Sequence, residues 1–213
     1  MSAREGAAPF DSGRWEAPRA ADLDIGLDPA FVGEREAARW LEELRSSLPW
    51  RQESIRIFGK TMPVPRLQSW HGDPGAGYRY SGLDLEPLPW TPLLTEIRGR
   101  IEAVVGGPPF NAVLANLYRD GRDSMGWHAD DEPELGPEPV IASLSLGASR
   151  TFHLRHRTRR ELGRLDLQLG TGSLLVMRGR TQECWQHALP KRTGRSGPGL
   201  RINLTFRRII LGG

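Results

Sequence analysis

Cysteine is almost absent from this sequence, because its 213 residues include only Cys184. An intramolecular disulfide is therefore excluded, and a reducing compartment is the simpler expectation. The sequence also lacks any apolar run close to the roughly 20 residues that a membrane-spanning helix needs. Its N-terminal stretch carries too many charges for an ordinary signal peptide. We therefore expect a cytoplasmic protein with no membrane partner.

A large charge excess is also missing. The 29 Lys and Arg against 26 Asp and Glu leave a formal net charge of +3, which is compatible with a polyanionic partner but identifies none. Glycine and proline are plentiful, at 25 and 17 residues, and indicate many turns in a β-rich protein. We expect residues 1–25 to be a poorly ordered segment and residues 26–213 to form one domain that acts as a monomer.

Two segments have the apolar spacing of amphipathic helices. The first opens at Asp28-Pro29 and continues to Leu48, and the second begins at Thr91-Pro92. Strand patterns occur at 53–58, 66–70, 111–119, 139–146, 150–155, 164–169, 173–177 and 200–208. This order predicts an α+β protein with a jelly roll core and flanking N-terminal helices.

One short motif offers two metal ligands. His128 and Asp130 are two residues apart, so in an extended chain they share one face. Taken alone, the motif also fits an exposed loop histidine beside a turn-forming aspartate. His187, near the end of a late strand, supplies a third ligand, and two histidines with one carboxylate leave positions open for further ligands, as in non-haem Fe(II) oxygenases. Zinc more often occupies a closed tetrahedron.

A rival histidine pair, His153 and His156, stands among arginines that would repel a cation. We interpret that run as part of a basic face able to contact phosphates. The face comprises Arg155, Arg157, Arg159, Arg160, Lys191, Arg192 and Arg195. For the last three, a solvated loop is the alternative interpretation.

The segment 201–207 alternates polar and apolar residues without a break. One face carries Arg201, Asn203, Thr205 and Arg207, and the other carries Ile202, Leu204 and Phe206. Two arginines that face an interior are costly unless anions pair with them, and a dicarboxylate such as 2-oxoglutarate offers one carboxylate to each. The alternative is an edge strand with solvated arginines. Asn116 and Tyr118 face one way on an earlier strand, either as part of this cradle or as ordinary core residues.

Five segments carry a resemblance to a known family: 116–121, 128–132, 141–147, 172–177 and 201–207. From about residue 50 to residue 210 the sequence resembles the AlkB family of nucleic-acid dealkylating dioxygenases, particularly its duplex-DNA repair branch. The resemblance implies a double-stranded β-helix fold and Fe(II) ligation by His128, Asp130 and His187. It also implies that 2-oxoglutarate is held by Asn116, Tyr118, Arg201, Asn203, Thr205 and Arg207.

The reaction implied by the resemblance is oxidation of an N-methyl group on a base such as 1-methyladenine or 3-methylcytosine in DNA. O₂ is consumed, 2-oxoglutarate is decarboxylated to succinate, and formaldehyde is released, so the alkylation damage is reversed directly. Arg201 and Tyr118 would bind the distal carboxylate, while Arg207 and Asn116 would approach the carboxylate beside the keto group. The alternatives are a 2-oxoglutarate-dependent enzyme acting on RNA, a protein or a small metabolite, and a damage-binding module without catalysis.

The resemblance also assigns substrate residues. An enzyme that acts on a base in a duplex must flip it out, stack it and fill the gap. Tyr78, Arg79 and Tyr80 match the family's substrate lid, and Asp131 matches a residue that contacts the exocyclic amino group of the base. The residues that resemble the finger wedged into the base stack are Ile57, Phe58, Gly59 and Lys60. A plain hairpin with Ile57 and Phe58 in the core is the alternative.

Overall fold

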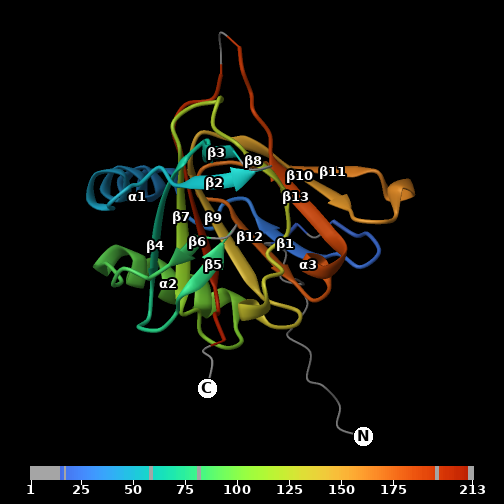
Figure 1. The fold of residues 1–213 in the computed structure, drawn as a ribbon, viewed down its shortest axis with the longest axis horizontal. Helices are drawn as coiled ribbons and strands as arrows, with labels where there is room; N and C mark the ends of the chain where they lie inside the picture. The colour runs from blue at the N-terminus through green and yellow to red at the C-terminus, as the bar shows by residue number, and fades with distance from the viewer. Residues whose placement is uncertain (1–14, 17, 58–59, 81–82, 195–196, 211–213) are drawn as a thin grey trace, which may run out of the picture.

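The computed structural model describes residues 15–16, 18–57, 60–80, 83–194 and 197–210, with the backbone alone at 55–57, 60, 78–80 and 83–85. Two antiparallel sheets form the body (Figure 1). The large sheet has the order β1 (Asp24–Asp28), β12 (Leu174–Arg178), β9 (Ile141–Gly147), β14 (Arg201–Arg207), β7 (Ala112–Tyr118) and β4 (Leu67–Gly72). The small sheet has the order β11 (Arg164–Leu169), β10 (Arg150–His156), β13 (Trp185–Leu189) and β8 (Met125–His128). The two sheets confirm the predicted double-stranded β-helix.

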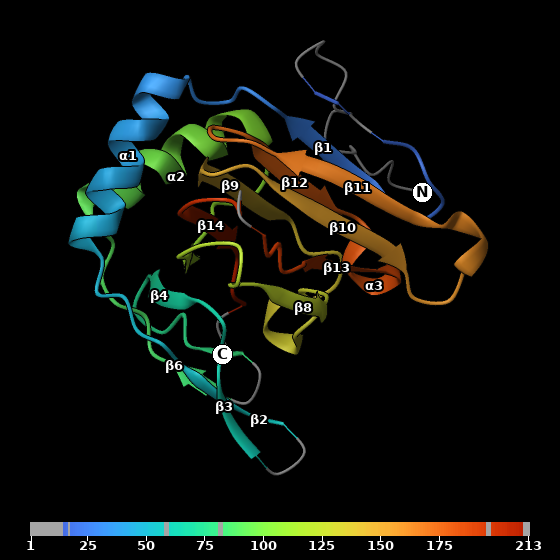
Figure 2. The same cartoon turned by 90° about the horizontal axis from the view of Figure 1, so that it is seen from above.

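Helices cover one face of the large sheet. Helices α1 (Glu34–Ser47) and α2 (Pro92–Val105) lie together on the side away from the small sheet (Figure 2). The short helical turns are η1 (Pro133–Leu135), η2 (Arg160–Leu162) and α3 (Thr181–Cys184). The predicted α+β class with N-terminal helices is therefore confirmed. In the described ranges, no helix combines the length and apolarity needed to cross a bilayer.

Two small hairpins stand apart from these sheets. They pair β2 (Ser54–Ile57) with β3 (Lys60–Pro63) and β5 (Tyr78–Tyr80) with β6 (Leu83–Leu85). Figure 2 shows both on the side of the molecule where β4 and β8 lie. The chain thus adds two hairpins at the edge of the double-sheet core.

The two predicted helix starts have different outcomes. The start of α2 is confirmed, because the Thr91 hydroxyl accepts the Leu94 N–H at 3.2 Å and Pro92 follows as the first helical residue. Helix α1 begins at Glu34 instead of near Asp28. Asp28 is the last residue of β1, and its carboxylate accepts a hydrogen bond from the Ala30 N–H at 3.1 Å. The side chain therefore stabilises a turn rather than a helix start.

Strand β1 was not predicted, and the segment before it makes contacts as well. Glu16 pairs with Leu27, and the Trp185 indole N–H donates to the Ala21 carbonyl at 3.1 Å. These contacts lie within the range expected to be poorly ordered. The domain boundary at residue 25 stays a prediction, while the sheet itself takes in Asp24.

Strand β14 lies in the middle of the large sheet, between β9 and β7. Its apolar residues Ile202, Leu204 and Phe206 pack into the core cluster beneath the helices. Arg201 and Arg207 point the other way and are each 2% exposed. The predicted division into two faces is confirmed, and the alternative of a solvated edge strand is wrong.

We expect Gly172→Ala to lower the free energy of unfolding by about 3 kcal/mol. Gly172 has φ +77°, and a Cβ there would lie 2.1 Å from the Val32 carbonyl oxygen. Gly170→Ala is the matched control, because a Cβ at Gly170 meets nothing within 4 Å. Urea denaturation of both variants tests this, and equal midpoints would contradict it.

Candidate metal centre

The structure brings the three predicted metal ligands together in the small sheet. His128 ends β8 and pairs in register with His187 of β13, while Asp130 follows β8 by two residues. One donor atom from each lies within 4.8 Å of the others. The centres of the two imidazole rings are 4.2 Å apart, with the rings edge to face. The arrangement offers two nitrogens and one carboxylate oxygen to a single ion.

Neighbouring groups orient these donors. The Nδ1 of His128 lies 2.9 Å from the Gly126 carbonyl oxygen, which can only accept a hydrogen bond, so Nδ1 carries the proton and the Nε2 lone pair is available. His187 stacks on the Phe152 ring at a centroid distance of 5.1 Å. The Asp130 N–H donates to the Gln182 side-chain oxygen at 2.9 Å. Each of the three residues is therefore fixed in position by a contact with a neighbouring group.

The buried charges favour the protonation states that a metal requires. Burial alone would raise the pKa of Asp130, but Arg207 and the two histidines reverse this and lower it to about 2. Arg207 Nη2 donates to Asp130 Oδ1 at 2.5 Å. Burial and the nearby His128 lower the pKa of His187 to about 3, and burial also lowers the pKa of His128. At neutral pH the site has an ionised carboxylate and two neutral imidazoles, as metal ligation demands.

The metal candidates share one pocket with the predicted cosubstrate residues. Its empty volume is about 460 Å³, open mouth included. The lining residues are Asn116, Tyr118, Met125, His128, Asp130, Ser143, Phe152, Met177, His187, Leu189, Arg201, Asn203, Thr205 and Arg207. All nine residues predicted from the sequence to bind the metal or the cosubstrate therefore line one pocket. The predicted cosubstrate residues all come from strands β7 and β14 of the large sheet.

Arg201 has the properties of an anion receptor. Its Nη2 donates to Ser145 at 2.9 Å, its Cζ lies 5.3 Å from the centre of the Tyr118 ring, and its buried Nε has no hydrogen-bond partner. Burial lowers its pKa to about 10. Within the part of the chain that the structure describes, no carboxylate forms an ion pair with it. A buried cation without a counter-ion beside a metal triad fits one end of a dicarboxylate.

Several hydrogen-bonding partners in the pocket were not predicted. The Asn116 side-chain oxygen accepts from Arg66 Nε at 2.8 Å and from Gln68 Nε2 at 3.1 Å. Asn203 Nδ2 donates to the Ser143 hydroxyl at 2.8 Å. The serines of β9 could have been found, because Ser143 and Ser145 alternate with buried leucines along the strand. The sequence has no comparable signal for Arg66 and Gln68.

Of the predicted substrate residues, only the side chain of Asp131 is described. It forms an ion pair with Arg157 and does not line the pocket. Phe58 and Gly59 lie outside the described residues. The same holds for the side chains of Ile57, Lys60, Tyr78, Arg79 and Tyr80, although their backbones form the two hairpins. The finger and the lid therefore stay predictions.

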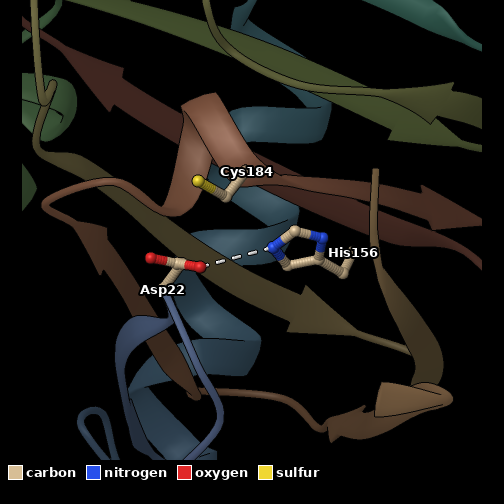
Figure 3. A group of neighbouring side chains, drawn as sticks. All are labelled: Asp22, His156 and Cys184. Carbon is tan, nitrogen blue, oxygen red and sulfur yellow. Dashed lines mark ion pairs between the residues drawn. The ribbon is translucent and has the colours of Figure 1, made fainter. Parts of the chain in front are cut away.

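A second group of possible ligands lies at the far end of β10. Asp22, His156 and Cys184 place one donor atom each within 4.8 Å of the others (Figure 3). The Nδ1 of His156 accepts the backbone N–H groups of Thr158 and Arg159 at 3.2 and 3.0 Å. A neutral His156 therefore carries its proton on Nε2, which faces Asp22 at 3.6 Å and has no lone pair for a metal.

The charges around this second group also disfavour a cation. Arg180 Nη1 pairs with Asp22 at 2.9 Å, and Arg159 lies 4.0 Å from the same carboxylate. Burial raises the pKa of the Cys184 thiol, so it stays protonated at neutral pH. The group joins the segment before β1 to the small sheet, and the His128 triad is the better metal candidate.

Comparison with known proteins agrees with this geometry. A family model described as the 2OG-Fe(II) oxygenase superfamily matches residues 24–207. The solved structure titled "The structure of OsALKBH1" superposes with a TM-score of 0.62 at 18% identity, and covers 91% of this chain and 100% of that one. At that identity the likeness shows the fold alone.

Curated relatives are much more similar in sequence. The mouse "Alpha-ketoglutarate-dependent dioxygenase alkB homolog 3" is 44% identical over 193 residues, which are 87% of this chain and 66% of the relative, just under two thirds. The human "DNA oxidative demethylase ALKBH2" is 41% identical over 206 residues, which are 92% of this chain and 77% of the relative. The predicted family is thereby confirmed: the chain belongs to the AlkB family of Fe(II)- and 2-oxoglutarate-dependent dioxygenases.

Proposed function

We propose that this chain repairs alkylated nucleic acid by oxidising N-methyl groups on bases such as 1-methyladenine and 3-methylcytosine in DNA. The observation that carries the proposal is the single pocket in which the metal triad faces two buried arginines. The name of the human relative, a DNA oxidative demethylase, supports the substrate class. Each turnover would consume O₂ and 2-oxoglutarate and yield succinate, CO₂ and formaldehyde.

The proposal gives the metal-side residues distinct tasks. The Nε2 atoms of His128 and His187 and the free oxygen of Asp130 would hold Fe(II), which supplies O₂ activation when bound. Arg207 keeps the Asp130 carboxylate ionised and oriented through their ion pair. The same guanidinium would approach the carboxylate beside the keto group of 2-oxoglutarate, together with Asn116.

The other end of the cosubstrate would lie deeper in the large sheet. Arg201 and Tyr118 would bind the distal carboxylate, because Arg201 is buried and its described neighbours leave its charge uncompensated. Asn203 and Thr205 line the same wall and would contact the chain between the carboxylates. The dicarboxylate would thus lie along β14 with one end near each arginine.

The location and the assembly state belong to the proposal. A reducing compartment such as the cytoplasm suits a chain whose single thiol is buried with a raised pKa. We propose that the chain acts as a monomer on DNA, with RNA as a further substrate.

His128→Ala and Asp130→Ala should each abolish binding of Mn(II), a surrogate for Fe(II). The two variants should differ in their free energy of unfolding. His128→Ala removes a half-buried side chain, whereas Asp130→Ala breaks a buried ion pair and should cost about 3–5 kcal/mol of unfolding free energy. Calorimetric titration and urea denaturation measure the two effects. Asp131→Asn is the control, and unchanged Mn(II) affinity in either ligand variant would refute the triad.

Arg201→Ala should raise the KM for 2-oxoglutarate about 10- to 100-fold, because a buried charge-assisted contact to a carboxylate is lost. The kcat should change less, since high 2-oxoglutarate should refill the pocket. Arg208→Ala is the matched control, because Arg208 follows β14 but is exposed. A drop in kcat with an unchanged KM would contradict the assigned role.

The proposed activity predicts formaldehyde release from a 3-methylcytosine oligonucleotide in the presence of Fe(II), ascorbate and 2-oxoglutarate. Succinate and formaldehyde should appear in equal amounts, and omission of 2-oxoglutarate should stop both. The assay is run with single-stranded and duplex forms of one sequence. Succinate without formaldehyde on either form would reject this substrate class and favour a protein or a small metabolite.

A further inference from the structure

The outer face of the small sheet carries a group of side chains that the proposed reaction does not use. Side chains alternate between the faces of a strand, and the metal ligands His128 and His187 point inward to the pocket. Their neighbours Trp127 and Gln186 therefore point outward. Leu154 packs in the core between the sheets, which sets Arg155 on the same outer face. This face lies directly behind the metal centre.

Three of these outward side chains form a layered unit, here named the Trp127 platform: Trp127, Arg155 and Gln186. The Arg155 guanidinium carbon lies 4.1 Å from the centre of the Trp127 ring. Gln186 holds the guanidinium there, because its side-chain oxygen accepts from Arg155 Nη2 at 2.9 Å and Nε at 3.2 Å. Each residue comes from a different strand, so the sheet fixes their positions.

The platform is exposed and positively charged. Trp127 is 36% exposed, high for so large an aromatic side chain, and Arg155 is exposed as well. Among the described residues, no carboxylate pairs with Arg155. Arg164 on the same face differs, because Asp166 pairs with it at 2.7 Å. An indole with a clamped, uncompensated guanidinium offers a flat surface and a positive charge together.

We propose that the Trp127 platform binds an unpaired base of a single nucleic-acid strand, next to the nucleotide whose base enters the metal pocket. The inference rests on the proposed function, which brings a strand to this end of the sheet. Strand β8 is the edge of the small sheet. A nucleic-acid chain that leaves the pocket can therefore pass around β8 to the outer face. The base stacks on the exposed face of this indole–guanidinium layer, and the charge of Arg155 attracts its phosphate.

The same geometry selects for unpaired nucleotides. In a duplex both faces of a base are covered by its neighbours, so only an unpaired base can present a face to the platform. A protein partner with an acidic surface would need the charge of Arg155 but not a flat aromatic surface. The chain should therefore favour strands that are unpaired beside the lesion, and the indole should contribute to binding as much as the charge.

The test uses the full chain and a labelled thymidine oligonucleotide, with binding measured by fluorescence anisotropy. Trp127→Ala should weaken single-strand binding about tenfold, and Arg155→Gln by a similar factor, while binding to a fully paired duplex changes less. Trp127→Phe should retain most of the affinity, because a phenyl ring also stacks. Arg164→Gln is the matched control on the same face and should bind like the unaltered chain.

Three outcomes would overturn the platform. The first is equal single-strand affinity in Trp127→Ala and the unaltered chain, and the second is an equal loss on duplex. The third is displacement of the oligonucleotide by poly-glutamate as effectively as by unlabelled thymidine oligonucleotide, which would indicate a plain charged patch.

A purely structural role is tested with free 3-methylcytidine. If Trp127→Ala lost turnover of the nucleoside and the methylated oligonucleotide equally, the indole would serve the metal centre and the platform would be rejected. Failure of the proposed function is distinguishable, because the unaltered chain would then release no formaldehyde from any methylated oligonucleotide.

Discussion

The ion pair between Arg207 and Asp130 is the constraint on which the site depends. Both side chains are almost fully buried, and two buried charges are tolerated only when they compensate each other. Arg207 ends β14 in the large sheet, and Asp130 follows β8 in the small sheet. The pair therefore connects the two sheets at the candidate metal centre, and it favours the ionised form of the Asp130 carboxylate.

From this link the site divides into two halves with different chemistry. The small sheet contributes the metal donors, which are neutral or anionic, and the large sheet contributes cations and hydrogen-bond donors along β14 and β7. A divalent cation would find its complement on the first wall, and a dianionic cosubstrate on the second. Apolar residues such as Phe152 and Met177 line the same pocket, and a less polar surrounding strengthens the electrostatic interactions within it.

Structural elements could be predicted from the sequence where the pattern that specifies them lies among neighbouring residues. The alternation in 201–207 predicted both faces of β14, and Thr91 with Pro92 predicted the start of α2, because strand period and helix capping involve near neighbours. Strand β1 was missed, since a five-residue strand with a central glycine has little pattern of its own. Pairing with β12 stabilises it, and that partner is distant in sequence.

The site followed the same rule. The three metal candidates could be named from their residue types and the family resemblance. The link from Arg207 to Asp130 could not, because it joins positions 77 residues apart. Nor does any local pattern place Arg66 against Asn116, or Arg155 over Trp127. Contacts of this kind appear only when the sheets are assembled.

Because the candidate metal donors and the candidate cosubstrate residues belong to separate sheets, their positions relative to one another depend on the side chains packed between those sheets. Leu154 and Leu175 belong to these packed side chains, and neither of them lines the pocket. A larger or smaller side chain at Leu154 or Leu175 would change the spacing of the two sheets. The candidate metal donors would then shift relative to the candidate cosubstrate residues. In this architecture the geometry of the candidate centre therefore depends on hydrophobic residues that lie outside the pocket.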